Sequence, residues 1–82
     1  MITFTLRIHP GFQHFVRRVP VGKTLEMKVP EATTVFYFLK THTGMDMQAH
    51  CLVLLNGQQV HKEDKALKNG DRLAVFPIIA GG

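Results

Sequence analysis

The sequence has a single cysteine, Cys51, among its 82 residues. A disulfide within the chain is therefore excluded, and a domain of this size has to rely on one small apolar core. The longest apolar run, Cys51 to Leu55, is far shorter than the roughly 20 residues that span a bilayer. From Ile2 to Ile8 the residues alternate, whereas a secretory signal carries an unbroken apolar block. We therefore expect one cytoplasmic domain with no membrane partner.

Charge of one sign is not concentrated anywhere in the sequence. Ten lysines and arginines stand against six aspartates and glutamates, which gives a formal net charge of +4. Only Arg17-Arg18 and the stretch 62–68 hold basic residues close together, and two acids interrupt the second group. Nucleic-acid-binding proteins usually gather basic residues on one stripe beside stacking aromatics. We therefore expect no nucleic-acid partner, and interpret the charge as favouring solubility and acidic protein partners.

The spacings that build common catalytic and cofactor sites are also missing. The five histidines do not share one predicted element at metal-ligand spacing, so no metal site is expected. There is no glycine-rich phosphate loop, so nucleotide binding is expected of a partner. Cys51, alone in an apolar stretch, is interpreted as core filling. Glu63 and Asp64, between Lys62 and Lys65, are interpreted as a solvated loop.

What the sequence does contain is a series of strand patterns. Strands are predicted over residues 2–8, 24–29, 51–55, 58–60 and 72–77. In the first, every second residue is apolar, which is the pattern of a half-buried strand. Asn56-Gly57 favours a two-residue hairpin turn, and Asn69-Gly70 favours a second turn. Residues 12–22 show no steady period and are interpreted as a loop with one helical turn.

One amphipathic helix is predicted between the second and third strands. Thr33 or Thr34 is the predicted N-cap, because a threonine hydroxyl accepts a hydrogen bond from a free N–H of the first turn. The predicted buried face follows helical spacing and consists of Val35, Phe38, Leu39 and His42. Gly44 is the predicted stop, and residues 45–49 are a predicted linker. The order predicts an α+β fold in which the helix covers one face of a mixed four- to five-stranded sheet.

The sheet face away from the helix is expected to carry an apolar patch. Because alternate residues of a strand face opposite sides, Phe76 in the last strand and Leu54 in the third both point away from the helix. Clustered exposed apolar residues usually mark a partner site. Pro77 restricts the chain direction where the last strand ends, since its φ angle is fixed. Burial of this patch under the loop at 12–19 stays open as an alternative.

Residues 1–77 are expected to form the domain, and residues 78–82 a flexible tail that ends in two glycines. Glycine lacks a Cβ, so Gly81 and Gly82 can enter a channel too narrow for any side chain. The terminal carboxylate of Gly82 is sterically bare but a poor electrophile. Adenylation by ATP would activate it for attack by sulfur. The alternative is a frayed terminus with no role.

Three elements of the closing third resemble the MoaD/ThiS family of ubiquitin-like sulfur carriers. They are the strand leading into Asn56-Gly57, the Leu-x-x-Gly-Asp-x-Leu run from Leu67 to Leu73, and the Phe-Pro-x-x-Ala-Gly-Gly end from Phe76 to Gly82. Residues 9–30 match the family only in outline. The resemblance implies the β-grasp (ubiquitin-like) fold, with the first and last strands side by side.

The resemblance also implies a carrier that is a co-substrate and not itself an enzyme. An E1-like enzyme would use ATP to adenylate Gly82, and a sulfurtransferase would supply sulfur to form a thiocarboxylate. The carrier itself would bind no cofactor. An acceptor enzyme or a larger synthase subunit would then take the sulfur. The residues implied in partner binding are Phe76, Leu54, Pro77, Ile78, Ile79 and Ala80.

Two acceptor pathways and two other classes of function stay open. The Phe-Pro junction and the long first connection favour the small subunit of a molybdopterin or tungsten-pterin synthase. The Ile-Ala-Gly-Gly end favours thiazole synthesis for thiamin. A protein modifier joined to lysines through Gly82 would share the same acyl-adenylate. The third class is a β-grasp interaction module with an inert tail.

Overall fold

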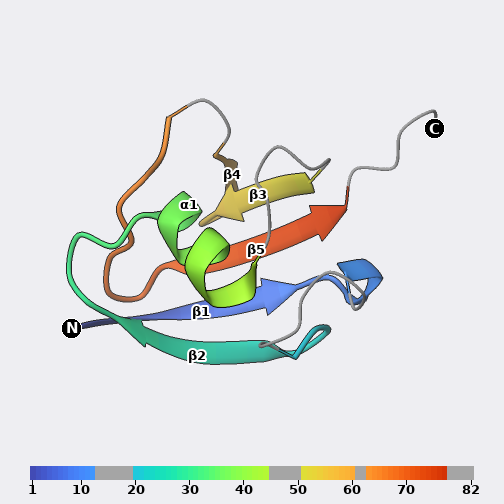
Figure 1. The fold of residues 1–82 in the computed structure, drawn as a ribbon, viewed down its shortest axis with the longest axis horizontal. Coiled ribbons are helices and arrows are strands. Elements are labelled where there is room, and N and C mark those ends of the chain that lie inside the picture. Colours follow the sequence, from blue (N-terminus) through green and yellow to red (C-terminus); the bar gives the residue numbers. More distant parts are fainter. Residues whose placement is uncertain (13–19, 45–50, 61–62, 78–82) are drawn as a thin grey trace.

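The computed structural model describes residues 1–12, 20–44, 51–60 and 63–77. Within these ranges a five-stranded sheet carries a short helical segment on one face (Figure 1). The strands are β1 (Ile2–Ile8), β2 (Thr24–Val29), β3 (Cys51–Leu55), β4 (Gln58–Gln59) and β5 (Arg72–Pro77). The helical elements are η1 (Pro10–Phe12), α1 (Val35–Phe38) and η2 (Leu39–Thr43). The predicted strands are confirmed, except that the fourth ends one residue earlier than predicted.

The strand order across the sheet is β2-β1-β5-β3-β4. The two central strands, β1 and β5, run parallel, and the other neighbouring pairs run antiparallel. Parallel neighbours need a long crossover, and here the helical segment and the β3–β4 hairpin lie between them in the sequence. The predicted α+β architecture, a mixed sheet with one helical segment across it, is confirmed.

Strand β1 follows the predicted alternation. Every second residue, from Ile2 to Ile8, is buried, and the residues between them are partly or fully exposed. Strand β2 pairs with β1 along its whole length and lies at the sheet edge. Its outward residues include Glu26 and Lys28, and charged side chains of this kind discourage pairing with further strands.

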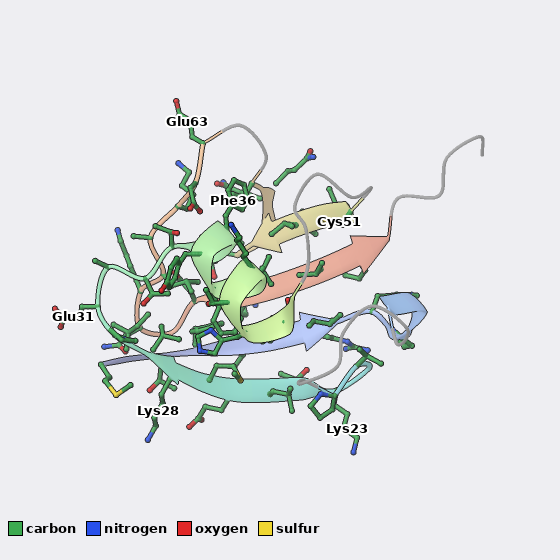
Figure 2. The ribbon with its side chains drawn as sticks, in the orientation of Figure 1. Lys23, Lys28, Glu31, Phe36, Cys51 and Glu63 are labelled. Carbon is green, nitrogen blue, oxygen red and sulfur yellow. The ribbon has the colours of Figure 1, made fainter. Side chains whose placement is uncertain are left out.

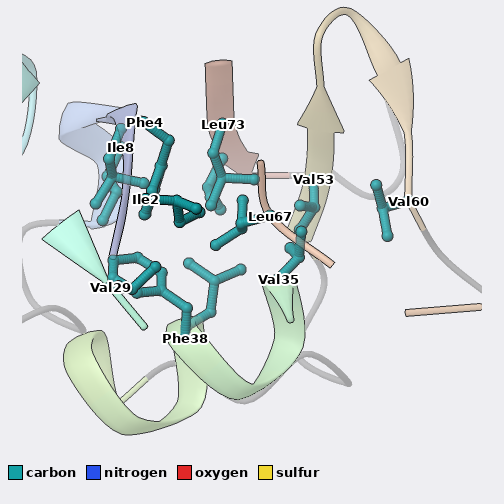
Figure 3. Packing of buried hydrophobic residues seen from close by; sticks show 13 residues of the cluster. Ile2, Phe4, Ile8, Val29, Val35, Phe38, Val53, Val60, Leu67 and Leu73 are labelled. Atoms are coloured by element: carbon teal, nitrogen blue, oxygen red, sulfur yellow. The ribbon is translucent and has the colours of Figure 1, made fainter. Parts of the chain in front are cut away.

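The core lies between the sheet and the helical segment (Figure 3). Among the described residues it consists of Ile2, Phe4, Leu6, Ile8, Val29, Val35, Phe38, Leu39, Val53, Val60, Leu67, Leu73 and Val75. The rings of Phe4 and Phe38 meet edge to face, with centroids 5.0 Å apart and planes at 87°. This geometry brings the positive edge of one ring to the negative face of the other.

The first turn of α1 satisfies its free N–H groups with acceptors from two parts of the chain. Thr34 is the N-cap, one of the two predicted, and its hydroxyl oxygen accepts from the Tyr37 N–H at 3.3 Å. The Val35 N–H donates to the Lys65 carbonyl at 2.8 Å, and the Phe36 N–H donates to the Asp64 carboxylate at 3.0 Å. Asp64 is exposed, as the loop interpretation predicted, but its carboxylate also caps a helix 28 residues away.

The prediction that His42 belongs to the buried face of the helix is wrong. After Phe38 the helix widens into the π-helical turn η2, so Thr43 is buried instead and the His42 side chain is exposed. A π turn closes hydrogen bonds five residues apart, which moves the core-facing position one residue further along. The His42 ring stacks on the Phe38 ring, with centroids 4.8 Å apart. Gly44, at φ 73°, ends the helix as predicted.

A polar clasp ties the β3–β4 turn to the start of β5. The turn residues Asn56 and Gly57 have φ angles of 53° and 83°, as the predicted Asn-Gly turn requires. The Asn56 side-chain oxygen accepts from the Arg72 N–H, and its side-chain nitrogen donates to the Asp71 carboxylate, both at 2.9 Å. The same carboxylate accepts from the Lys68 N–H at 2.8 Å. Asp71 of the Leu67–Leu73 run therefore helps to position the start of β5.

Some predictions fall on segments outside the described ranges. The 3-10 turn η1 lies at Pro10–Phe12, mostly before the stretch 12–22 for which one helical turn was predicted, and that prediction falls largely on residues 13–19, which are not described. The linker at 45–49 is not described either. The proposed tail, residues 78–82, is likewise not described. Over the part of the chain that is described, no helix is long and apolar enough to cross a membrane.

Candidate functional site

The candidate site is built on the sheet face opposite the helical segment. Antiparallel pairing of β3 with β5 places Leu52 opposite Phe76 and Leu54 opposite Ala74. Val53, Leu73 and Val75, which alternate with them along the strands, are buried in the core, so these four side chains point to the other face. We call Leu52, Leu54, Ala74 and Phe76 the apolar patch.

The two residues that the sequence singled out lie diagonally in this patch. Phe76 and Leu54 are not direct cross-strand partners, because Phe76 lies opposite Leu52 and Leu54 lies opposite Ala74. Diagonal neighbours in a sheet lie about 7–8 Å apart, which is within reach of an aromatic side chain. All four patch residues are half-buried, and none belongs to the core cluster. The alternative that residues 12–19 cover the patch falls outside the described residues.

His9 extends the patch on the β1 side. Its N–H donates to the Val75 carbonyl at 2.9 Å, which continues the parallel pairing one residue beyond β1. Its ring lies 6.0 Å from the Phe76 ring, with the planes tilted by 54°. The Nδ1 atom accepts a hydrogen bond from the Gly11 N–H at 3.0 Å, which holds the ring in this orientation. Two hydrogen bonds to backbone groups therefore fix the position of His9 at the edge of the patch.

The end of β5 joins the patch to the predicted tail. Pro77 is the last residue of β5 and pairs with Cys51 at the beginning of β3. Figure 2 labels Cys51 at this end of β3. The predicted tail therefore begins, at residue 78, only two residues after Phe76 of the patch. The other predicted site residues, Ile78, Ile79, Ala80, Gly81 and Gly82, lie outside the described ranges, so their roles stay predictions.

Cys51 is partly buried and packs against the core cluster, which agrees with its interpretation as core filling. Of the histidines, His9 and His42 are described, and they lie on opposite sides of the sheet. Within the described ranges, histidine, cysteine, aspartate and glutamate side chains form no group of three or more that could hold a metal ion.

A shallow, open groove of about 430 Å³ lies elsewhere, where β2 leads into α1. Its lining is Pro30, Glu31, Ala32, Thr33, Thr34 and Tyr37. The Thr34 hydroxyl is already engaged by the helix cap, and the Thr33 hydroxyl donates to the Pro30 carbonyl at 2.7 Å. These contacts give the groove a structural role in the turn, so the apolar patch is the stronger candidate.

Sequence reasoning did not name Leu52, Ala74, His9, Arg7 or Arg72 as site residues. Alternation along the predicted strands does assign Leu52, Ala74, Arg72 and Arg7 to the outward faces of their strands. That Arg7 and His9 lie beside the patch depends on which strands are neighbours. The parallel register places Arg7 opposite Ala74 and Arg72 opposite Thr5, and no local pattern contains that information.

Comparisons with known proteins agree with this architecture. A model of the ThiS family matches residues 15–82. The fold is similar to a structure from Pyrococcus furiosus described as a molybdopterin converting factor, subunit 1, with a TM-score of 0.67 and 21% identity over 96% of this chain and 100% of that one. It is also similar to SAMP1 from Haloferax volcanii, with a TM-score of 0.65 and 21% identity over 98% and 99% of the two chains. No curated protein sequence gives a significant match. These likenesses confirm the predicted β-grasp fold.

Proposed function

The chain belongs to the ThiS family, and from that membership we propose that it carries sulfur as a thiocarboxylate on Gly82. The observation that carries the proposal is the extent of the family match. It runs from residue 15 through residue 82 and so includes both glycines as well as β5 and its patch. The proposal requires Gly82 to hold the free carboxylate of the protein.

The chemistry follows from the weakness of a carboxylate as an electrophile. An oxygen of the Gly82 carboxylate attacks the α-phosphorus of ATP, and pyrophosphate leaves. Hydrosulfide then attacks the carbonyl carbon of the acyl-adenylate and displaces AMP, which leaves a thiocarboxylate and releases a proton. A persulfide donor gives the same product after a thiol has reduced the resulting acyl disulfide. Gly81 and Gly82 contribute by the lack of side chains, which lets the carbonyl carbon enter a narrow active site.

In this scheme the nucleotide and the catalytic groups belong to partners. The carrier itself binds no cofactor, and it supplies the activated carbon together with a docking surface. The apolar patch is that surface, because it lies next to the strand end from which the tail begins. Phe76 is its most suitable anchor, since buried aromatic side chains dominate the binding energy of many interfaces. The residues that precede the two glycines would then occupy the entrance of the partner's channel; they are Pro77, Ile78, Ile79 and Ala80.

Two acceptors of the sulfur are compatible with this chemistry. The name of the Pyrococcus furiosus structure and the Phe-Pro junction favour a pterin precursor, with the carrier as the small subunit of a synthase. The name of the family model and the Ile-Ala-Gly-Gly end favour thiazole synthesis. Sulfur transfer from the purified thiocarboxylate to each acceptor enzyme distinguishes them.

The proposal is tested by incubating the full chain with the E1-like adenylating enzyme of the same organism, ATP and a sulfide donor. Intact-mass spectrometry should show the exchange of one oxygen for one sulfur, and fragmentation should localise it to Gly82. A variant without Gly82 should fold with an unchanged melting temperature and acquire no sulfur, because a terminal segment contributes little to folding. Higher-mass conjugates to lysines would identify a protein modifier instead. Failure to form an adenylate with an enzyme that activates another carrier would contradict both.

A further inference from the structure

Two arginines stand beside the apolar patch on the open face of the sheet. Arg7 of β1 and Arg72 of β5 are both exposed, and they alternate with buried residues on their strands. The parallel register places Arg7 directly opposite Ala74, and Arg72 precedes Ala74 by two residues on the same strand. Arg7 therefore borders the patch on its β1 side, and Arg72 borders it at the end of β5 nearest the β3–β4 turn.

Neither arginine side chain is neutralised within the described part of the chain. No hydrogen bond or ion pair of either side chain occurs there. The Asp71 carboxylate, next in sequence to Arg72, accepts from Asn56 and from the Lys68 N–H instead. Glu26 of β2 lies opposite Thr5, so β1 separates it from Arg72 by two strand spacings of about 4.8 Å. It is a diagonal neighbour of Arg7, which pairs with Thr24, but the two side chains form no ion pair in the described structure. An uncompensated positive charge thus borders an apolar surface.

We propose that Arg7 and Arg72 bind carboxylates on the docking surface of the activating enzyme while the apolar patch seats on an apolar area next to them. The inference rests on the proposed carrier function and specifies the chemistry of its partner. A guanidinium group matches a carboxylate in shape and can donate two parallel hydrogen bonds. The net charge of +4 acts in the same direction, since it attracts an acidic surface from a distance.

The composition of this face favours an acidic protein over the other occupants. Single-stranded nucleic acid binds to several stacking aromatics, whereas the patch offers one aromatic and two leucines. A second copy of the chain would bring the same patch against itself in a symmetric dimer. The arginines of the two copies would then approach one another, and like charges at an interface disfavour association.

The arginines and the patch are expected to affect different steps. Charged groups at the rim of an interface mainly raise the rate of encounter, and salt weakens them because the screening length is about 8 Å at physiological ionic strength. The patch, once desolvated, slows dissociation. Removing the arginines should therefore raise the KM for the carrier and leave kcat nearly unchanged.

The test measures ATP–pyrophosphate exchange catalysed by the E1-like enzyme of the same organism, with the full chain as substrate. Arg7→Glu and Arg72→Glu should each raise the KM several-fold at low salt, and the double variant about tenfold or more, with the difference shrinking as salt is added. Arg72→Lys should retain most of the wild-type KM because it keeps the charge. Lys40→Glu is the matched control, since it makes the same charge change on η2, on the other side of the sheet, and should stay within about twofold of wild type. Thermal unfolding verifies that each variant is folded.

The outcomes separate this inference from the carrier function. Suppose that the wild-type chain is adenylated and that the double variant has the same KM as wild type at every salt concentration. That result would overturn the inference and leave the carrier function intact. An equal loss in Lys40→Glu would also overturn it, because net charge alone would then explain the effect. Absence of any adenylation of the wild-type chain would overturn the carrier function itself. Binding of a single-stranded oligonucleotide, or formation of a dimer, that is lost in the double variant would assign the arginines to that occupant instead.

Discussion

Replacing Asp64 by alanine should destabilise the fold through a helix 28 residues away in sequence. The Asp64 carboxylate accepts the Phe36 N–H at 3.0 Å and the Lys65 N–H at 2.9 Å. The first N–H belongs to the opening turn of α1 and has no acceptor within the helix. The second belongs to the segment whose carbonyl, at Lys65, accepts the Val35 N–H. One carboxylate thus holds both the start of the helix and the loop that contacts it.

The magnitude follows from what a cap contributes. Loss of a side-chain cap costs about 1 kcal/mol, within a range of about 0.5–2 kcal/mol. Asp64 is exposed, so water can partly replace the carboxylate, and we expect a value near 1 kcal/mol, not one near the upper limit. For a domain of this size, that lowers the melting temperature by about 4–8 °C.

Urea and thermal unfolding followed by far-ultraviolet circular dichroism measure this loss. Asp64→Asn keeps an acceptor oxygen and should cost less than about 0.5 kcal/mol. Glu63→Ala removes the neighbouring exposed carboxylate, which caps no helix in the described structure, and should lie within about 0.5 kcal/mol of wild type. If Asp64→Ala and Glu63→Ala have the same stability, the cap does not contribute and the reasoning is wrong. If Asp64→Asn is as unstable as Asp64→Ala, the carboxylate acts by its charge and not as an acceptor.

Three further predictions concern the site and its support. Phe76→Asp should raise the KM of the activating enzyme for the carrier by more than about tenfold, because the interface loses a central anchor. The melting temperature should change little, because Phe76 is a half-buried surface residue. Unchanged ATP–pyrophosphate exchange kinetics would show that the patch takes no part in recognition. Asn56→Gly keeps the positive φ of 53° but removes the side-chain hydrogen bonds to Arg72 and Asp71, so urea unfolding should show a loss of about 1–2 kcal/mol; no loss would mean that the clasp is not stabilising. Ala32 has a φ of 69°, which strains a residue that carries a Cβ. Ala32→Gly relieves this strain but raises the entropy of the unfolded chain, so the net gain in the free energy of unfolding should be about 0.5 kcal/mol. A lower melting temperature of the variant would contradict this.

Features that depend on neighbours in the chain were predictable. The limits of β1 and β2 follow from alternation, and the Asn-Gly turn follows from the φ angles that its residues tolerate. The Thr34 cap and the Gly44 stop follow from local hydrogen bonding and backbone freedom. Each of these signals lies within a few residues of the structure that it predicts.

Features that join distant segments were not predictable in this way. His42 has the spacing of a core residue, but packing widens the helix after Phe38 and turns Thr43 inward. The acidic residue of a capping box is missing after Thr34, and Asp64 replaces it from another part of the chain. The sequence alone offers no reason to connect these residues, because their proximity depends on how the segments pack.

The sequence by itself determined the order of the elements, the two faces of each strand and the diglycine that predicts the chemistry. The family resemblance implied that the first and last strands are neighbours, but only the tertiary structure decided the register of β1 against β5, which places Arg7 and His9 beside the apolar patch. The physical reason is that side-chain alternation is a property of one strand, whereas register arises from burying one shared core. A residue's face can therefore be read from its own segment, but its neighbours across the sheet cannot.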